Sequence, residues 1–253
     1  MADYDEHRLR SRESDLMTLG VTTAARFQNP QAVRHLRQGF YRRGLMMKES
    51  RFQINAIIAE AAGKNLDPYK TCDLNIHLNS YYIHIRGALD NLAWSLQYEF
   101  GLLPGVEEEN VKGRSACSLF GQKFVTALRG VLPGTVTVLE RKRVWEQELK
   151  TLRDPVAPRI PLYAIPGIAT EQESHEIRHL HELASKAYQK GDLQAGNSYL
   201  HEAATIGQYI PAFLDSTPNG LRMKSIPEQM VSDFLNFAEL CEALLKAAST
   251  SRA

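Results

Sequence analysis

The sequence lacks the features that mark several whole classes of protein. Its three cysteines, Cys72, Cys117 and Cys241, are odd in number and far apart, which excludes a disulfide framework and a paired-cysteine metal site. No run approaches the roughly 18 apolar residues that a membrane-spanning helix requires, and no signal-peptide core follows the charged N-terminal stretch 1–12. We therefore expect a protein of the reducing cytoplasm that does not enter a membrane.

An excess of charge of either sign is also absent. The chain carries 30 Lys and Arg against 29 Asp and Glu. This balance excludes a protein coated with positive charge, so any site for a polyanion has to be a local patch. The glycine-rich loops of nucleotide hydrolases and dinucleotide-binding folds are missing, as is the G-x-S-x-G turn of serine hydrolases. We expect no cofactor.

Strict alternation of apolar and polar residues, the pattern of strands, is scarce, and apolar residues instead recur at the spacing of helices. The clearest helix is predicted over Pro68 to Phe100, because Asp67 can cap it and Pro68 suits its first turn. One face of this helix collects Leu74, Leu78, Tyr81, Ile85, Leu89, Leu92 and Leu96. We predict an all-α fold with this helix at its centre and with more than half of the residues helical.

A second long helical stretch is predicted from Pro30 to about Ala62, with a kink or break near Gly39 and Gly44, which weaken a helix. Further helices are predicted over residues 119–132, 135–152, 170–190, 192–209 and 227–248, with a loop over 101–118 and a proline-rich, non-helical stretch over 155–166. This pattern divides the chain into an N-terminal segment 1–29, a helical bundle core 30–163, and C-terminal helices over 164–253 that pack on the bundle.

Two short stretches carry a resemblance to a known family. Arg153 and Asp154 form an arginine–polar pair, and Pro158 stands where a histidine would complete a catalytic motif. On the central helix Tyr82, Arg86 and Asp90 follow one another at intervals of four, so they can touch, and a plain ion pair of Arg86 with Asp90 within the helix is the favoured alternative to a site. Together these residues resemble the HEPN superfamily of helical RNases and their relatives, over about Pro30 to Tyr163.

The resemblance implies an up-and-down helical bundle that dimerises, with two Arg/His motifs facing one another across a cleft. In active members the histidine acts in metal-independent RNA cleavage and the arginine holds the phosphate. Proline cannot move a proton, so we expect no cleavage here, a phosphate-binding role for Arg153 and a supporting one for Asp154. The resemblance also suggests a toxin–antitoxin or defence setting, with an antitoxin as partner protein. The alternative interpretation of the Arg153 segment is a helix end followed by a proline-braced linker.

The stretch His175-Glu176-Ile177-Arg178-His179 matches H-E-x-x-H, in which two histidines one turn apart bind zinc and the glutamate activates water. A third ligand would have to be a residue such as Glu202 on a separate helix. Arg178 places a positive charge beside the proposed metal, so a solvated polar helix face is the favoured interpretation and a zinc hydrolase the alternative.

The second helical stretch carries the only local excess of positive charge. Phe40 and Tyr41 lie among its cations, and aromatic side chains beside cations are how single-stranded RNA is held without base readout. The cations of this basic strip are Arg34, Arg37, Arg42, Arg43, Lys48 and Arg51, and the default interpretation of such a strip is a solvated helix face. The sequence therefore favours a homodimeric helical protein that binds RNA or another phosphate-bearing ligand through Arg37, Arg42, Arg43, Arg86 and Arg153, over an enzyme. A structural interaction bundle without a ligand is the other alternative.

Overall fold

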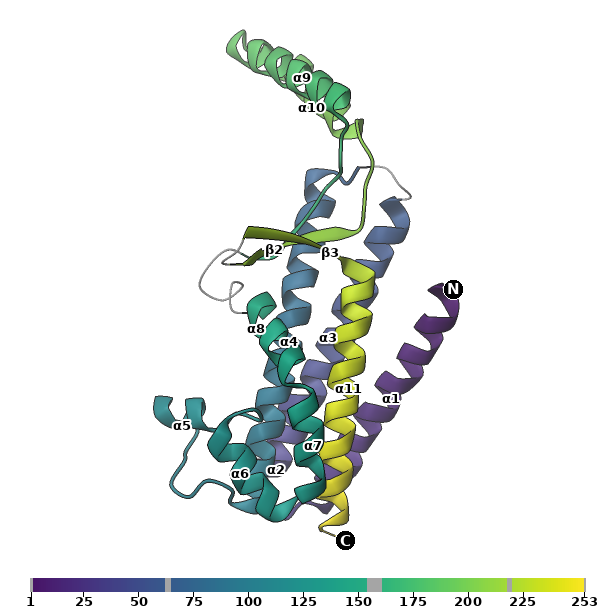
Figure 1. Cartoon of the computed structure of the whole chain (residues 1–253). Helices are drawn as coiled ribbons and strands as arrows, with labels where there is room; N and C mark the ends of the chain where they lie inside the picture. Colours follow the sequence, from purple (N-terminus) through teal and green to yellow (C-terminus); the bar gives the residue numbers. More distant parts are fainter. Residues whose placement is uncertain (1, 62–64, 154–160, 218–219, 253) are drawn as a thin grey trace. The chain divides into compact units, whose positions relative to one another are not determined.

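The computed structural model describes residues 2–61, 65–153, 161–217 and 220–252. It is 76% helical with one small sheet of three strands, so the prediction of an all-α fold is confirmed (Figure 1). The chain forms two compact units, each assembled from separate segments. The bundle unit comprises Met1–Arg51, Asn79–Pro161 and Glu228–Ala253, and the sheet unit comprises Phe52–Leu78 and Leu162–Pro227.

The predicted second helical stretch is present and contains a change of helix type. It consists of α2 (Pro30–Arg34), the π-helical segment η1 (His35–Phe40) and α3 (Tyr41–Ala61). The π-helical turns lie at Gly39, where the sequence predicted a kink or break. Wider turns of this kind are rare and occur most often at functional sites, because they change the direction in which side chains point. Helix α1 (Ala2–Arg26) precedes this stretch and fills most of the segment 1–29, for which the sequence carried no helix prediction.

The central helix α4 (Pro68–Phe100) has the bounds that the sequence predicts. Asp67 caps it, because its Oδ1 accepts from the backbone N–H groups of Tyr69 and Lys70. The apolar residues of its predicted inner face are all buried, with at most 2% of each exposed. The periodicity of this segment was therefore sufficient to identify both the helix and its buried face.

Four shorter helices follow α4, and here two predictions are wrong. Helix α5 (Val111–Ala116) lies within the predicted loop, where Asn110 caps it by accepting from the N–H of Lys112. The helix predicted over 135–152 is instead two helices, α7 (Pro133–Arg141) and α8 (Arg143–Arg153), which meet at Lys142 with φ −91° and ψ 4°. Helix α6 (Gln122–Val131) agrees with its prediction.

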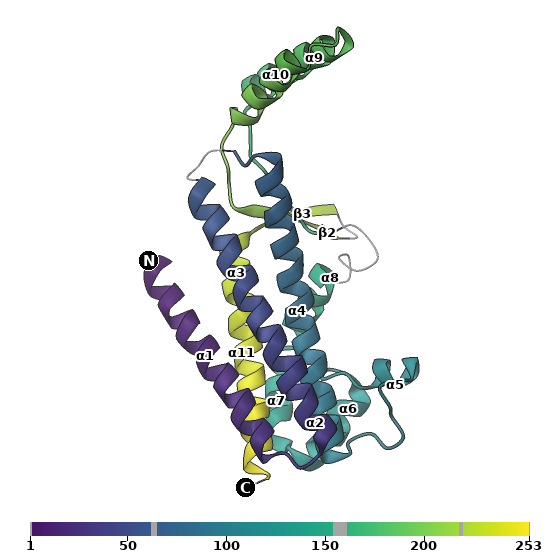
Figure 2. The same ribbon diagram turned by 180° about the vertical axis from the view of Figure 1, so that it is seen from behind.

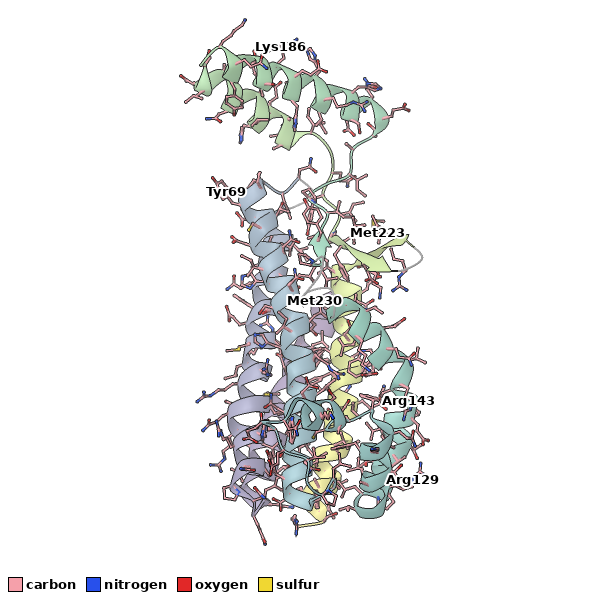
Figure 3. The ribbon with its side chains drawn as sticks, turned by 90° about the vertical axis from the view of Figure 1, so that its left-hand side faces the viewer. Tyr69, Arg129, Arg143, Lys186, Met223 and Met230 are labelled. Carbon is pink, nitrogen blue, oxygen red and sulfur yellow. The ribbon has the colours of Figure 1, made fainter. Side chains whose placement is uncertain are left out.

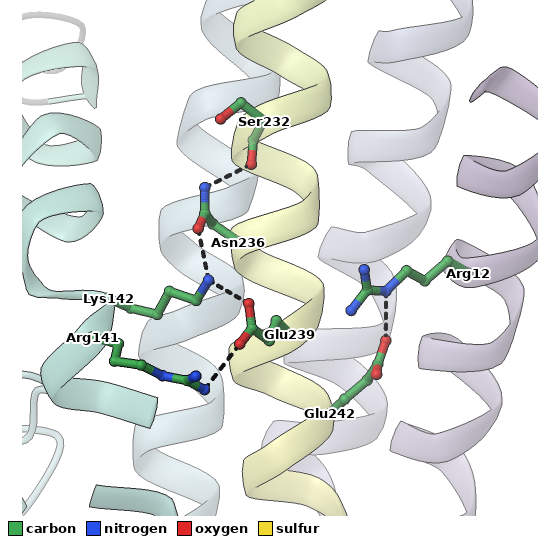
Figure 4. Close-up of polar contacts among 7 residues, drawn as sticks. All are labelled: Arg12, Arg141, Lys142, Ser232, Asn236, Glu239 and Glu242. Atoms are coloured by element: carbon green, nitrogen blue, oxygen red, sulfur yellow. Dashed lines mark hydrogen bonds and ion pairs between the residues drawn. The ribbon is translucent and has the colours of Figure 1, made fainter. Parts of the chain in front are cut away.

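Helix α11 (Ile226–Thr250) completes the bundle unit and runs beside α4 in both views (Figures 1 and 2). Polar contacts hold its outer face: Lys142 donates to Asn236 at 2.8 Å and also contacts Glu239, and Arg12 of α1 pairs with Glu242 at 2.9 Å (Figure 4). Met230 lies inside the unit, whereas Arg129 of α6 is at the surface (Figure 3).

A buried carboxylate joins three helices of the bundle unit. Asp233 of α11 is 1% exposed and accepts from the Tyr82 hydroxyl of α4, the Trp145 indole N–H of α8 and the Gln229 amide, each at 3.0 Å. A buried carboxylate is costly unless its oxygens accept hydrogen bonds. Asp233 therefore fixes the positions of α4 and α8 against α11.

The sheet unit contains the ends of α3 and α4, a helical hairpin and a small sheet. The hairpin is formed by α9 (Glu171–Gln189), which begins with a Thr170/Glu173 capping box, and α10 (Leu193–Thr205), close to the predicted bounds. The sheet is antiparallel, in the order β1 (Tyr163–Ala164), β2 (Ala212–Thr217) and β3 (Gly220–Ser225).

No strand was predicted in this unit. One reason is that buried Asp215, paired with Arg222 at 2.7 Å, interrupts the apolar pattern of β2. No helix among the described residues has the length and apolar character needed to cross a membrane.

We predict that Asp233→Ala lowers the free energy of unfolding by about 3 kcal/mol, because two buried donors and the half-buried Gln229 amide lose their acceptor. Tyr82→Phe removes one of these hydrogen bonds and should cost about 1 kcal/mol. Denaturant titration followed by tryptophan fluorescence measures both values. As a control, Asp73→Ala on the exposed face of α4 should change stability by no more than about 0.5 kcal/mol. Equal effects of Asp233→Ala and Asp73→Ala would contradict the proposed role of Asp233.

Candidate functional site

A polar groove lies in the bundle unit between the α2–η1–α3 stretch and α4, which run side by side (Figure 2). Arg34, Gln38, Arg42 and Met46 recur every four residues, which places them on one face of the stretch. The groove has a volume of about 510 Å³ and is lined by Arg34, His35, Gln38, Gly39, Arg42, Arg43, Met46, His84, Asn91 and Glu108. We call it the basic groove.

A second cavity adjoins the basic groove and shares Arg43, Asn91 and Glu108 with it. Its volume is about 570 Å³, and its other lining residues are Arg86, Gly87, Asp90, Trp94, Ser115, Cys117, Ser118 and Lys150. We call it the side pocket. Because Arg43 lines both cavities, a ligand that fills one of them reaches the wall of the other.

Two glycines allow the helices on either side of the groove to approach closely. A Cβ atom on Gly87 of α4 would lie 2.4 Å from Cζ of Arg43, so the Arg43 guanidinium rests against the α4 backbone. A Cβ atom on Gly39 of η1 would lie 1.9 Å from Oδ1 of Asn91. At both positions the neighbour would have to move to admit a Cβ atom; at Gly87 this is the flexible end of Arg43, and at Gly39 it includes Cβ of Asn91. The glycine that weakens the helix is therefore the residue that admits Asn91.

A chain of hydrogen bonds crosses the floor of the groove. Asn91 donates from Nδ2 to the carbonyl of Gly87 at 2.7 Å, which leaves its Oδ1 to accept from Nδ1 of His35 at 3.1 Å. The other ring nitrogen of His35 lies 3.2 Å from Oε2 of Glu108. The His35 ring also stacks on Tyr98, with 5.5 Å between ring centroids. The imidazole of His35 is thus held in one orientation from both sides.

His84 on α4 accepts from the Arg43 guanidinium, with 3.4 Å between Nη1 and Nδ1. Burial, and secondly the positive charge of Arg43, lower the pKa of His84. The ring is therefore neutral near pH 7, and its proton is on Nε2. His84 thus holds Arg43 by a hydrogen bond without adding a competing positive charge.

The basic strip predicted from the sequence separates into different environments. Arg34, Arg42 and Arg43 line the basic groove, whereas Arg37 and Lys48 are exposed and line neither the groove nor the side pocket. Two other members of the strip are buried. Arg51 pairs with Glu13 of α1 at 2.9 Å, and Phe40 packs on Phe237 and so cannot stack on a base.

Arg86 and Asp90 contact each other as their spacing predicts, with 3.4 Å between Nε and Oδ1. Arg86 also pairs with buried Glu146 of α8 at 2.9 Å, and Glu146 in turn accepts from Lys150 at 2.8 Å. The third residue of the series, Tyr82, donates its hydroxyl hydrogen bond to Asp233 of α11. Arg86 therefore forms part of the wall of the side pocket while it neutralises a buried carboxylate.

The Arg153 motif falls at the edge of what the structure describes. Helix α8 ends at Arg153, and Asp154 and Pro158 lie outside the described residues. The phosphate-binding role of Arg153 and the supporting role of Asp154 remain predictions.

His175 and His179 lie on the exposed face of α9, whose buried residues are Leu180, Ala184 and Ala187. Within the described ranges, no three His, Cys, Asp or Glu side chains are grouped so that they can hold a metal ion. The geometry thus provides no support for Glu202 as a third zinc ligand.

The structure adds groups that the sequence analysis did not identify: His35, His84, Asn91 and Glu108. The signal in the sequence that could have pointed to them was the presence of Gly39 and Gly87 within helices, which indicates a close approach of another group. A glycine does not indicate which side chain approaches it. Cys117 also lines the side pocket. Burial, with the charges of Asp90 and Glu108, raises the pKa of its thiol far above the usual range, so it stays protonated and is a poor nucleophile.

Comparison with family models, with curated proteins and with solved structures finds no match to this chain.

We predict opposite effects of alanine at the two glycines of the groove. Gly87→Ala should keep or raise the free energy of unfolding, by up to about 1 kcal/mol, because it meets only the movable end of Arg43 and improves helix propensity. Gly39→Ala should lower it by about 1 to 3 kcal/mol, because Cβ of Asn91 lies at 2.9 Å and is fixed to α4. Denaturant titration measures both, and equal losses would show that Arg43 cannot move.

Zinc analysis of the dialysed protein tests the His175 motif. We expect well under one zinc per chain, because both histidines are exposed and the described residues offer no third ligand. His179→Ala should change the free energy of unfolding by less than about 0.5 kcal/mol. Stoichiometric zinc that is lost in this variant would instead establish a metal site.

Proposed function

We propose that the protein binds RNA or another phosphate-bearing ligand in the basic groove. The observation that carries this proposal is the gathering of Arg34, Arg42 and Arg43 on one cavity, with a single acidic residue, Glu108, among the lining residues. The whole chain is nearly neutral, so this concentration of positive charge is local. A cavity lined in this way attracts anions of the size of a phosphate group.

The position of Arg43 favours a phosphate over a diffuse negative charge. Its guanidinium is held against Gly87 and by His84, so less side-chain freedom is lost when a ligand binds. An arginine held in this way can donate two parallel hydrogen bonds to a phosphate. Arg34 and Arg42 add charge at the open side of the groove, where they can follow a ligand that carries several phosphates.

The proposal extends the resemblance to the HEPN superfamily. The helical bundle unit is compatible with it, and the groove offers a phosphate site in a chain whose motif has Pro158 in place of the RNase histidine. On this proposal the protein is a cytoplasmic, homodimeric relative that binds RNA without cleaving it. The toxin–antitoxin setting and an antitoxin partner remain part of the same proposal.

We predict that Arg42→Ala combined with Arg43→Ala weakens binding of fluorescein-labelled oligouridylate by about ten-fold at low salt, because two phosphate contacts are lost. The negative slope of log K against log salt should become shallower by about 1.4 between about 50 and 200 mM salt, because each single-strand phosphate contact contributes about 0.7. Fluorescence anisotropy at several salt concentrations measures both quantities.

The matched control is Arg37→Ala combined with Lys48→Ala, which removes two positive charges from the same helical stretch outside the groove. This variant should bind within about two-fold of the unchanged protein. Equal losses in the two double variants would show binding to general surface charge. No binding by the unchanged protein at low salt would favour a structural interaction bundle.

A further inference from the structure

Three consecutive glutamates, Glu107, Glu108 and Glu109, lie between α4 and α5. The segment that carries them is fixed at both ends. Near its start, the Gln97 amide both donates to the carbonyl and accepts from the N–H of Leu103, each at 2.8 Å. At its end, Gly113 of α5 lies so close to the Glu107 carbonyl that an added Cβ would be 2.1 Å from the oxygen.

Of the three glutamates, only Glu108 lines the basic groove and the side pocket. Its carboxylate lies 3.2 Å from Nε2 of His35, while 47% of its side chain is exposed. The negative charges of this segment also act on their surroundings. Burial is the main cause that raises the pKa of the Tyr98 hydroxyl, and the negative charges of Glu108 and Glu109 raise it further. Tyr98 in turn stacks on the His35 ring.

The Glu108 carboxylate therefore occupies a place suited to a phosphate oxygen. It lies beside Nε2 of the His35 ring, whose position Asn91 fixes through Nδ1, in a cavity that three arginines line; Nε2 donates to an anion when both ring nitrogens carry a proton. Exposed pairs of this kind are weak, so a ligand can displace the carboxylate. A terminal phosphate carries more charge and more acceptor oxygens than a carboxylate. A phosphodiester of RNA carries a single charge, and it competes because several phosphates of one strand contact the groove at once.

We propose that Glu108 is an internal competitor of the ligand: a phosphate group binds beside His35 by displacing the Glu108 carboxylate. This inference rests on the proposed function of the groove and adds its regulation. It assigns His35 as a phosphate-contacting residue. It also implies that Glu108 weakens the binding of anions with little charge, whereas a ligand with several phosphates, such as single-stranded RNA, still binds.

Binding of fluorescein-labelled oligouridylate to three variants tests the proposal at low salt. Glu108→Gln keeps the size of the side chain and removes its charge, so binding should become about five-fold tighter. The control Glu148→Gln makes the same change of charge on an exposed residue of α8 outside both cavities, and should bind like the unchanged protein. In the Glu108→Gln background, His35→Gln should abolish the gain. Circular dichroism melting confirms that each variant is folded.

The outcomes separate this proposal from the proposed function. If the unchanged protein binds through Arg42 and Arg43 but Glu108→Gln binds equally well, the role of Glu108 as a competitor is refuted, whereas ligand binding in the basic groove is supported. If Glu108→Gln and Glu148→Gln tighten binding equally, or the gain survives His35→Gln, general charge explains the effect and displacement at His35 is refuted. Binding by Glu108→Gln where the unchanged protein shows none supports the competitor and contradicts the proposed function of the unchanged protein. Absence of binding in both refutes the competitor together with the proposed function.

Discussion

The close approach of η1 and α3 to α4 is the constraint on which the candidate site depends. Gly39 and Gly87 remove the two side chains that would separate these helices, and Asn91 and Arg43 fill the freed space. Asn91 then orients His35, and Arg43 lines both cavities. The loss of helix propensity at Gly39, about 1 kcal/mol relative to alanine, is offset by the close packing of η1 against Asn91 of α4. The groove is thus a consequence of helix packing, and no loop has to move to create it.

The far wall of the site depends on a second set of buried charges. Asp233 holds Tyr82 of α4 and Trp145 of α8, and the adjacent residue Glu146 holds Arg86. Removing one member of a buried ion pair lowers stability by more than the pair contributes to it, because the remaining charge is then neither paired nor hydrated. Arg86 is therefore a weaker candidate for a ligand contact than Arg43, since a phosphate at Arg86 would have to compete with Glu146. The local excess of positive charge does not distinguish Arg43 from Arg86 as a ligand contact. Their hydrogen-bond and ion-pair partners do distinguish them.

Much of the fold could be predicted from the sequence, and the failures have physical causes. Helix α4 was predictable because capping, Pro68 and periodicity agree along the whole segment. The break at Lys142 was not, because its side chain bonds to α11, almost a hundred residues away in the chain. In the site, the basic strip could be predicted from the sequence, but the different environments of its cations could not. Arg51 is buried and paired with Glu13 of α1, whereas Arg42 and Arg43 line the groove. His35 and Glu108 are 73 residues apart, and only the folded chain brings them together.

A single acid among the groove's arginines has a further consequence for a chain of balanced charge. If the groove lacked Glu108, its arginines would attract any small anion, and abundant anions would compete with a ligand of low concentration. On this proposal, a ligand has to bind more strongly than the weak pair of His35 with Glu108 in order to displace the carboxylate. A ligand with several phosphates reaches that binding free energy more easily than separate anions do, because its phosphates bind together. On the proposed function, selectivity for a polyanion would follow from the contact between His35 and Glu108 and would not require recognition of any base.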